Sequence, residues 1–109
     1  MRLEQIKLEN VNDINIIKMV GVIDFLVEEI NRTNDMIKSL NEDINSLCNN
    51  NEWELVKVYE HVIEDTKSNL RNLEIQYNSR VKVLKDFDGY IYKDGNLYEE
   101  YEEVGAENA

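Results

Sequence analysis

One stretch of the chain decides the fold: residues 16–47, which read IIKMVGVIDFLVEEINRTNDMIKSLNEDINSL. Isoleucine recurs every seven residues in it, and a second, mostly apolar residue stands three places after each isoleucine. The isoleucines are Ile16, Ile23, Ile30, Ile37 and Ile44, and the second set is Met19, Leu26, Thr33, Leu40 and Leu47. This repeat forms one continuous stripe along a helix, at the a and d positions of a coiled coil. The stretch therefore predicts a long helix bound to another helix.

A second stripe with the same period follows in residues 56–87. Its a positions are Val56, Ile63, Leu70, Tyr77 and Leu84, and its d positions are Tyr59, Thr66, Leu73, Arg80 and Phe87. The short gap between the stripes predicts that the second helix folds back on the first. In the resulting register Ile16 lies beside Phe87 and Ile23 beside Arg80, whose guanidinium should reach outward to solvent.

Asparagine and aspartate predict where the two helices begin and end. Asn12 and Asp13 supply an N-cap for a first helix of about residues 13–48. The run Asn49–Asn51 suits a left-handed helix end, and Asn51 with Glu54 resembles a capping box for the second helix. We expect that second helix to end near Lys85.

The chain outside the helices predicts a small β element. Asp94-Gly95 stands between two alternating aromatic runs, which is a strong signal for a tight β-hairpin. Residues 1–10 form either a strand or a short helical turn. The predicted fold class is thus mainly α, a long antiparallel two-helix coiled-coil hairpin with a small C-terminal β-hairpin that an N-terminal strand can join. We expect one domain over residues 1–101 and an acidic disordered tail over residues 102–109.

The composition excludes several functional classes. The 109 residues carry a net charge of -11, with a pI near 4.4, which argues against direct binding to nucleic acid or to anionic membranes. Cys48 is the only cysteine, and no signal peptide or membrane span is indicated, so we expect a cytoplasmic protein. Abundant Asn and Ile without Pro are typical of AT-rich coding, as in low-GC bacteria and the viruses that infect them.

Catalytic and metal-binding patterns are weak in this sequence. The only histidine, His61, shares a predicted outward helical face with Glu64 and Asp65, which is an ordinary solvated arrangement. Three aspartates near two glycines, Asp86, Asp88 and Asp94, do not match the spacing of a calcium-binding EF-hand loop. No basic group near Cys48 in the sequence would activate its thiol. We therefore expect no enzymatic activity, no metal and no cofactor.

The flanks of the predicted seam point to self-association. Several g positions of the two helices are apolar, namely Val22, Met36, Leu55, Val62 and Val83. Because a two-helix hairpin leaves much of its seam exposed, this flank favours a homodimer that forms a four-helix bundle. The alternative is an elongated monomer. Trp53, near the turn, is a further candidate partner contact, since tryptophan is enriched at interface hot spots.

The C-terminal segment is the second candidate surface for a protein partner. Residues 86–109 contain eight acids and one base. Tyrosines and glutamates interleave there: Tyr90, Tyr92, Tyr98, Glu99, Glu100, Tyr101, Glu102 and Glu103. Tyrosine anchors combined with negative charge suit a basic surface on a partner, whereas an acidic tail that only confers solubility is the alternative.

Two functions from different classes fit these features. By size, charge and composition alone, the chain resembles as a class the small acidic proteins that phages make against host defence, such as anti-CRISPR or anti-restriction proteins. That resemblance implies an inhibitor that occupies a basic surface of a nucleic-acid-handling protein in a bacterial host cell. The alternative is a structural coiled-coil adaptor, scaffold or assembly chaperone that acts by oligomerisation.

Overall fold

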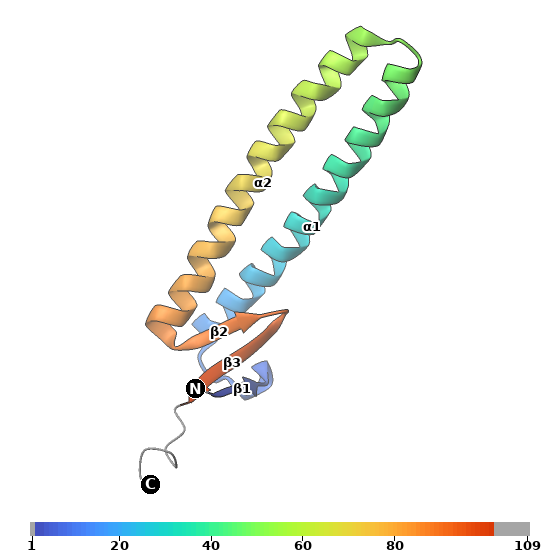
Figure 1. The fold of residues 1–109 in the computed structure, drawn as a ribbon. Coiled ribbons are helices and arrows are strands. Elements are labelled where there is room, and N and C mark those ends of the chain that lie inside the picture. The colour runs from blue at the N-terminus through green and yellow to red at the C-terminus, as the bar shows by residue number, and fades with distance from the viewer. Residues whose placement is uncertain (1, 102–109) are drawn as a thin grey trace. The chain divides into compact units, whose positions relative to one another are not determined.

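The computed structural model describes residues 2–101 and contains two long helices and one small sheet (Figure 1). The elements in chain order are β1 (Arg2–Ile6), the 3-10 helix η1 (Leu8–Asn10), α1 (Ile14–Asn49), α2 (Trp53–Asp88), β2 (Tyr90–Lys93) and β3 (Asn96–Tyr101). The predicted fold class, mainly α with two packed helices and a β element, is confirmed. The predicted disordered tail, residues 102–109, lies outside the described residues.

The chain divides into two compact units. The sheet unit comprises Met1–Phe25 and Tyr77–Ala109, and it contains all three strands with the first part of α1 and the last part of α2. The turn unit comprises Leu26–Gln76, in which α1 and α2 lie side by side and run in opposite directions on either side of their connection.

Burial along the helices follows the predicted heptads. Every a and d position from Ile16 to Leu47 is buried or half-buried, and the same holds for α2 from Val56 to Tyr77. Two threonines at seam positions, Thr33 and Thr66, donate their hydroxyls to the carbonyl oxygens of Glu29 and Val62 at 2.7 Å, so they carry no unpaired donor into the seam. The coiled-coil pattern therefore describes the inward faces of the helices correctly.

The connection between the helices is a Schellman motif. Asn51 has a left-handed backbone, with φ 59°. The amide of Glu52 donates to the carbonyl oxygen of Leu47 at 3.0 Å, and the amide of Asn51 donates to the carbonyl oxygen of Cys48 at 3.1 Å. The predicted left-handed end is thus confirmed. The predicted capping box is wrong, because Asn51 closes α1 and Glu52 takes the position before α2.

The outer ends of the two helices are also closed by local contacts. Asp13 caps α1, since its carboxylate accepts from the amide of Asn15 at 2.9 Å. The last helix runs three residues further than the predicted Lys85 and ends at Asp88. Gly89, with φ 75°, then donates its amide to the carbonyl of Lys85 at 3.1 Å, which is a left-handed cap that only glycine adopts without strain.

The three strands form one antiparallel sheet with β3 in the centre, in the order β1-β3-β2. Both residues of the β2–β3 turn have positive φ, 51° at Asp94 and 80° at Gly95, as a primed hairpin turn requires. Of the two predictions for the N-terminus, the strand is confirmed for residues 2–6, and a helical turn follows at residues 8–10.

The core of the sheet unit contains side chains from the sheet in place of the last predicted seam residue, Phe87. Ile23 and Leu84 are fully buried, and Tyr92 and Leu97 from the sheet are 6 % and 4 % exposed. Phe87, predicted to lie beside Ile16, is 82 % exposed, so that prediction is wrong. The reason is that strand side chains and not the last turn of α2 complete this core. Arg80 is exposed, as predicted.

Two glycines should respond oppositely to alanine. Gly95→Ala is expected to lower the free energy of unfolding by about 1–2 kcal/mol, because a Cβ is strained at its positive φ. Gly21→Ala should raise it by about 0.5–1 kcal/mol, because Gly21 lies inside α1 and, apart from the adjoining residues and backbone of its own helix, no atom lies within 4 Å of the added Cβ. Urea unfolding of both variants is the measurement, and a loss at Gly21 or none at Gly95 would contradict the assigned backbone.

Candidate functional site

Strand alternation divides the predicted tyrosine and glutamate surface between the two faces of the sheet. The pairing places Tyr98 opposite Ile91 and Gln5, and Glu100 opposite Leu3, on the face turned away from the core. Glu99 and Tyr101 project to the opposite face, which also carries the buried Tyr92 and Leu97. The interleaved sequence therefore does not form one surface.

Tyr92 was predicted to contact a partner, but it is buried in the core. Its hydroxyl donates to Oδ1 of Asp24 at 2.5 Å, and its ring meets that of Tyr77 edge to face, with centroids 6.3 Å apart. Burial, followed by the contact with Asp24, raises the pKa of Tyr92 far above its ordinary value. The side chain thus anchors the sheet to α1 and is covered from partners in this conformation.

Carboxylates gather at one end of the sheet. The register places Glu4 of β1 directly opposite Glu99 of β3, and Glu100, on the other face, lies opposite Leu3. We call Glu4, Glu99 and Glu100 the acidic sheet end. Like charges directly opposite on neighbouring strands repel, so this arrangement costs stability.

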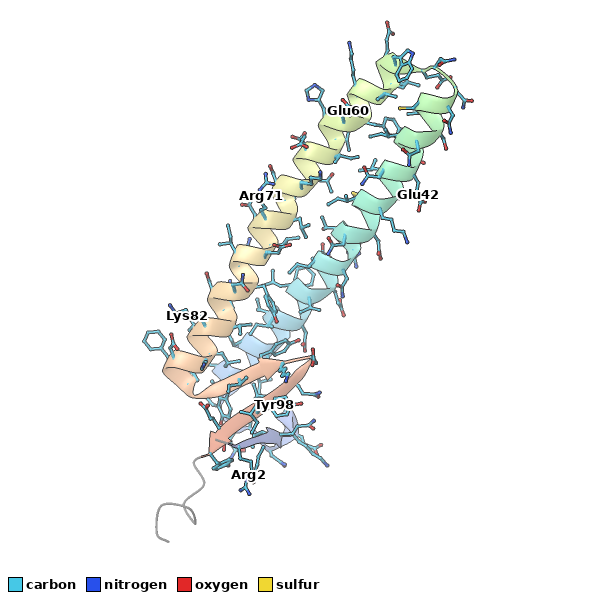
Figure 2. The ribbon with its side chains drawn as sticks, in the orientation of Figure 1. Arg2, Glu42, Glu60, Arg71, Lys82 and Tyr98 are labelled. Atoms are coloured by element: carbon cyan, nitrogen blue, oxygen red, sulfur yellow. The ribbon has the colours of Figure 1, made fainter. Side chains whose placement is uncertain are left out.

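The neighbours of the facing glutamates hold their side chains in place. Arg2 forms an ion pair with Glu4 at 2.7 Å, and the hydroxyl of Tyr101 donates to Oε2 of Glu99 at 2.6 Å. The bond to Glu99 raises the pKa of Tyr101. Arg2 and Tyr98 both project from the sheet in Figure 2. Three of the predicted tyrosines, Tyr90, Tyr98 and Tyr101, are half-buried or exposed. Tyr90 and Tyr101 share the face of Glu4 and Glu99, whereas Tyr98 shares the face of Glu100. The predicted Glu102 and Glu103 lie outside the described residues.

The predicted apolar flank is exposed in both units. In the sheet unit Val22 is 39 % and Val83 38 % exposed. In the turn unit Met36, Leu55 and Val62 are exposed by 51 %, 46 % and 42 %. Leu55, Val58 and Val62 are all exposed, and their three- and four-residue spacing places them on one face of α2.

Trp53 lies at the first position of α2, and it is 56 % exposed. With the chain from Asn51 to Leu55 it lines a pocket of about 330 Å³ in the turn unit. Its exposure agrees with a partner contact, but the pocket is lined by neighbours in sequence alone.

The residues considered for metal binding or nucleophilic chemistry do not form a site. His61 and Glu64 line a surface pocket of about 260 Å³ on α2, together with Lys57 and Glu60. Among residues 2–101, no three or more His, Cys, Asp and Glu side chains are grouped so that they could hold a metal ion. Cys48 is a half-buried free thiol. Within the same residues, neither helix is apolar over a stretch long enough to cross a membrane.

Comparisons with protein-family models, with curated proteins and with solved structures found no match to this chain. Glu4 was not predicted from the sequence as a member of this site. The alternation of residues 1–10 indicates a strand, but it does not show which strand these residues pair with. Asp24 was also missed as a partner of Tyr92, although it interrupts the most apolar stretch of α1.

Proposed function

We propose that this protein is a non-enzymatic, acidic protein-binding module whose acidic sheet end binds a basic surface of a partner. The partner class that we propose is a nucleic-acid-handling protein of a bacterial host, whose phosphate-binding surface the carboxylates of Glu4, Glu99 and Glu100 would occupy. The chain would then act in the bacterial cytoplasm as an inhibitor from a phage or mobile element. The composition supports this proposal, since its net charge of -11 complements such a surface.

The observation that carries the proposal is the direct opposition of Glu4 and Glu99 across the β1–β3 pair. Two carboxylates that face each other across a strand pair repel, and the ion pair of Arg2 with Glu4 and the hydroxyl of Tyr101 on Glu99 offset that repulsion only in part. A partner that places arginine or lysine between them relieves this repulsion, so the interaction that is unfavourable in the free protein favours the complex. Tyr90 and Tyr101 lie on the same sheet face as Glu4 and Glu99 and add amphipathic contact area beside these two charges.

Reversal of the acidic sheet end tests the proposal. The triple variant Glu4→Lys, Glu99→Lys, Glu100→Lys is expected to weaken binding of the captured partner about tenfold or more, because cations then meet cations. The measurement is affinity capture from lysate of a low-GC bacterium, with bound proteins identified by mass spectrometry. Circular dichroism verifies that the variant is folded.

A matched control carries the same charge change in the turn unit: Glu42→Lys, Glu60→Lys, Glu74→Lys. All three side chains are exposed on the helices, and Glu42 and Glu60 are labelled in Figure 2. The proposal expects the control to retain the partner. Equal loss with both variants would show that only net charge matters, and equal retention would show that the acidic sheet end makes no contact; either result contradicts the proposal.

A scaffold that acts by oligomerisation is the second candidate. It is favoured by the exposure of the flank Val22, Met36, Leu55, Val62 and Val83. This candidate expects the mass of a homodimer in sedimentation velocity, and it expects Val62→Glu to convert that dimer into a monomer. A wild-type monomer at high concentration would reject the scaffold and leave the first proposal unaffected.

A further inference from the structure

A pocket of about 360 Å³ lies in the sheet unit, apart from the acidic sheet end. Three segments line it. They are residues 5–9, between the end of β1 and the start of η1; Val20 and Asp24 of α1; and residues 95–97, at the hairpin turn and the start of β3. Its volume is at the small end of the roughly 300–1,000 Å³ typical of ligand pockets. A pocket of this size accepts one long side chain.

The lining combines an apolar floor with carboxylates. Val20 and Leu97 are only 5 % and 4 % exposed and provide the floor, while Asp24 and Glu9 supply two negative charges and Lys7 supplies one positive charge. Within residues 2–101 neither Asp24 nor Glu9 takes part in an ion pair. The pocket therefore offers net negative charge beside a surface on which methylene groups can pack.

Asp24 is held in position by the core. The hydroxyl of Tyr92 donates to Oδ1 of Asp24, and both residues belong to the sheet unit. A tyrosine hydroxyl is protonated at neutral pH, and burial and Asp24 raise the pKa of Tyr92 further, so this hydroxyl continues to donate there. One carboxylate oxygen is thus fixed by the protein, and the carboxylate is oriented before a ligand arrives, which lowers the entropic cost of binding.

We propose that this pocket binds an arginine side chain of the basic partner, with the guanidinium on Asp24 and the aliphatic stem on Val20 and Leu97. This inference deepens the proposed function and rests on it. Arginine fits better than lysine because its planar, weakly hydrated guanidinium donates several hydrogen bonds in a fixed fork to a carboxylate. The occupant is thus a protein side chain with a charged head and an apolar stem.

The test uses the full chain and a defined probe, the capped tripeptide acetyl-Gly-Arg-Gly-amide. Titration into ¹⁵N-labelled protein should give saturable shifts of the backbone amides of Leu8, Asp24 and Leu97, with a dissociation constant on the order of 1 mM for one side chain. The neutral isostere, with citrulline in place of arginine, should give none of these shifts.

Three variants make the assignment specific. Asp24→Asn should weaken binding about tenfold or more, because the charge-assisted bond is lost. Asp86→Asn removes the same charge at an exposed position of α2 in the same unit, and it should leave binding unchanged. Lys7→Gln should tighten binding roughly two- to fourfold, because it removes the one positive charge among the lining residues, which repels the guanidinium through water. Lys7 is exposed, so this variant tests the pocket even if Asp24→Asn fails to fold.

Several results would overturn the inference. They are equal shifts with the citrulline peptide, an unchanged affinity in Lys7→Gln, the absence of saturable shifts, and shifts confined to Glu4, Glu99 and Glu100. The last result would still support an acidic sheet end that binds cations. The proposed function is tested separately, by the capture experiment with the charge-reversed variant. A failure of the pocket assignment can therefore be distinguished from a failure of the proposed function.

Discussion

Tyr92→Ala is expected to lower the free energy of unfolding by about 3–5 kcal/mol, as removal of a buried aromatic side chain does. Tyr92 is 6 % exposed, packs edge to face on Tyr77 and donates to Asp24, so the variant loses an aromatic contact and a hydrogen bond and leaves a cavity. Such a loss is a large fraction of the 5–15 kcal/mol that stabilises a typical domain. Equilibrium unfolding in urea measures it, and a loss below 1 kcal/mol would contradict the placement of Tyr92 in the core.

The hydroxyl of Tyr92 can be tested alone with Tyr92→Phe, for which we expect a loss of about 1.5–3 kcal/mol, since the acceptor is a carboxylate. Tyr101→Phe is the matched control, because the hydroxyl of Tyr101 also donates to a carboxylate but from an exposed side chain. The control should change stability by less than about 0.5 kcal/mol. Equal effects of the two variants would argue against a special role for the hydrogen bond between Tyr92 and Asp24.

The contribution of the Tyr92 hydroxyl should also depend on pH. The pKa of Tyr92 in the folded protein is raised above the ordinary tyrosine value of about 10, which it keeps in the unfolded chain. A raised folded-state pKa stabilises the fold fully below pH 10, and this stabilisation is lost as pH rises above 10. The difference in stability between wild type and Tyr92→Phe should therefore shrink above pH 10. A difference that stays constant or grows there would contradict this assignment.

Ile23→Ala is expected to lower the free energy of unfolding by about 2–5 kcal/mol. Ile23 is an a-position isoleucine of α1 with no exposed surface, so the shortened side chain leaves a cavity in the core of the sheet unit. Ile75→Ala removes the same atoms at a position of α2 that is 63 % exposed, and it should change stability by less than about 0.5 kcal/mol. Similar losses in both variants would show that the heptad pattern does not separate core from surface.

The helical part of the fold could be predicted from the sequence because its determinants are local and periodic. A stripe such as Ile16, Ile23 and Ile30 fixes both the helix and its buried face. Asparagine and glycine at positive φ, as at Asn51 and Gly95, mark turns through their own backbone preferences. The capping box failed because Asn51 matched both a helix end and a helix start, and the Schellman motif required the first role.

The sheet could be predicted only in part, because strand pairing is not local. The hairpin follows from Asp94-Gly95, but the register of β1 on β3, and hence the facing pair Glu4 and Glu99, depends on contacts between the two ends of the chain. The same dependence explains Tyr92 and Phe87. Both are aromatic residues near the end of α2, and only the position of the sheet determines that Tyr92 is buried while Phe87 is exposed.

Binding of a basic protein surface by the acidic sheet end should make partner capture depend on salt. The protein is used as bait in lysate of a low-GC bacterium, and the retained proteins are identified after washes at low and at high ionic strength. We expect recovery of a basic nucleic-acid-handling protein at low salt and its release at high salt, because salt screens charges at exposed surfaces. Recovery of a partner that resists high salt, or of the chain itself alone, would rule out charge-driven binding at the acidic sheet end and favour the scaffold.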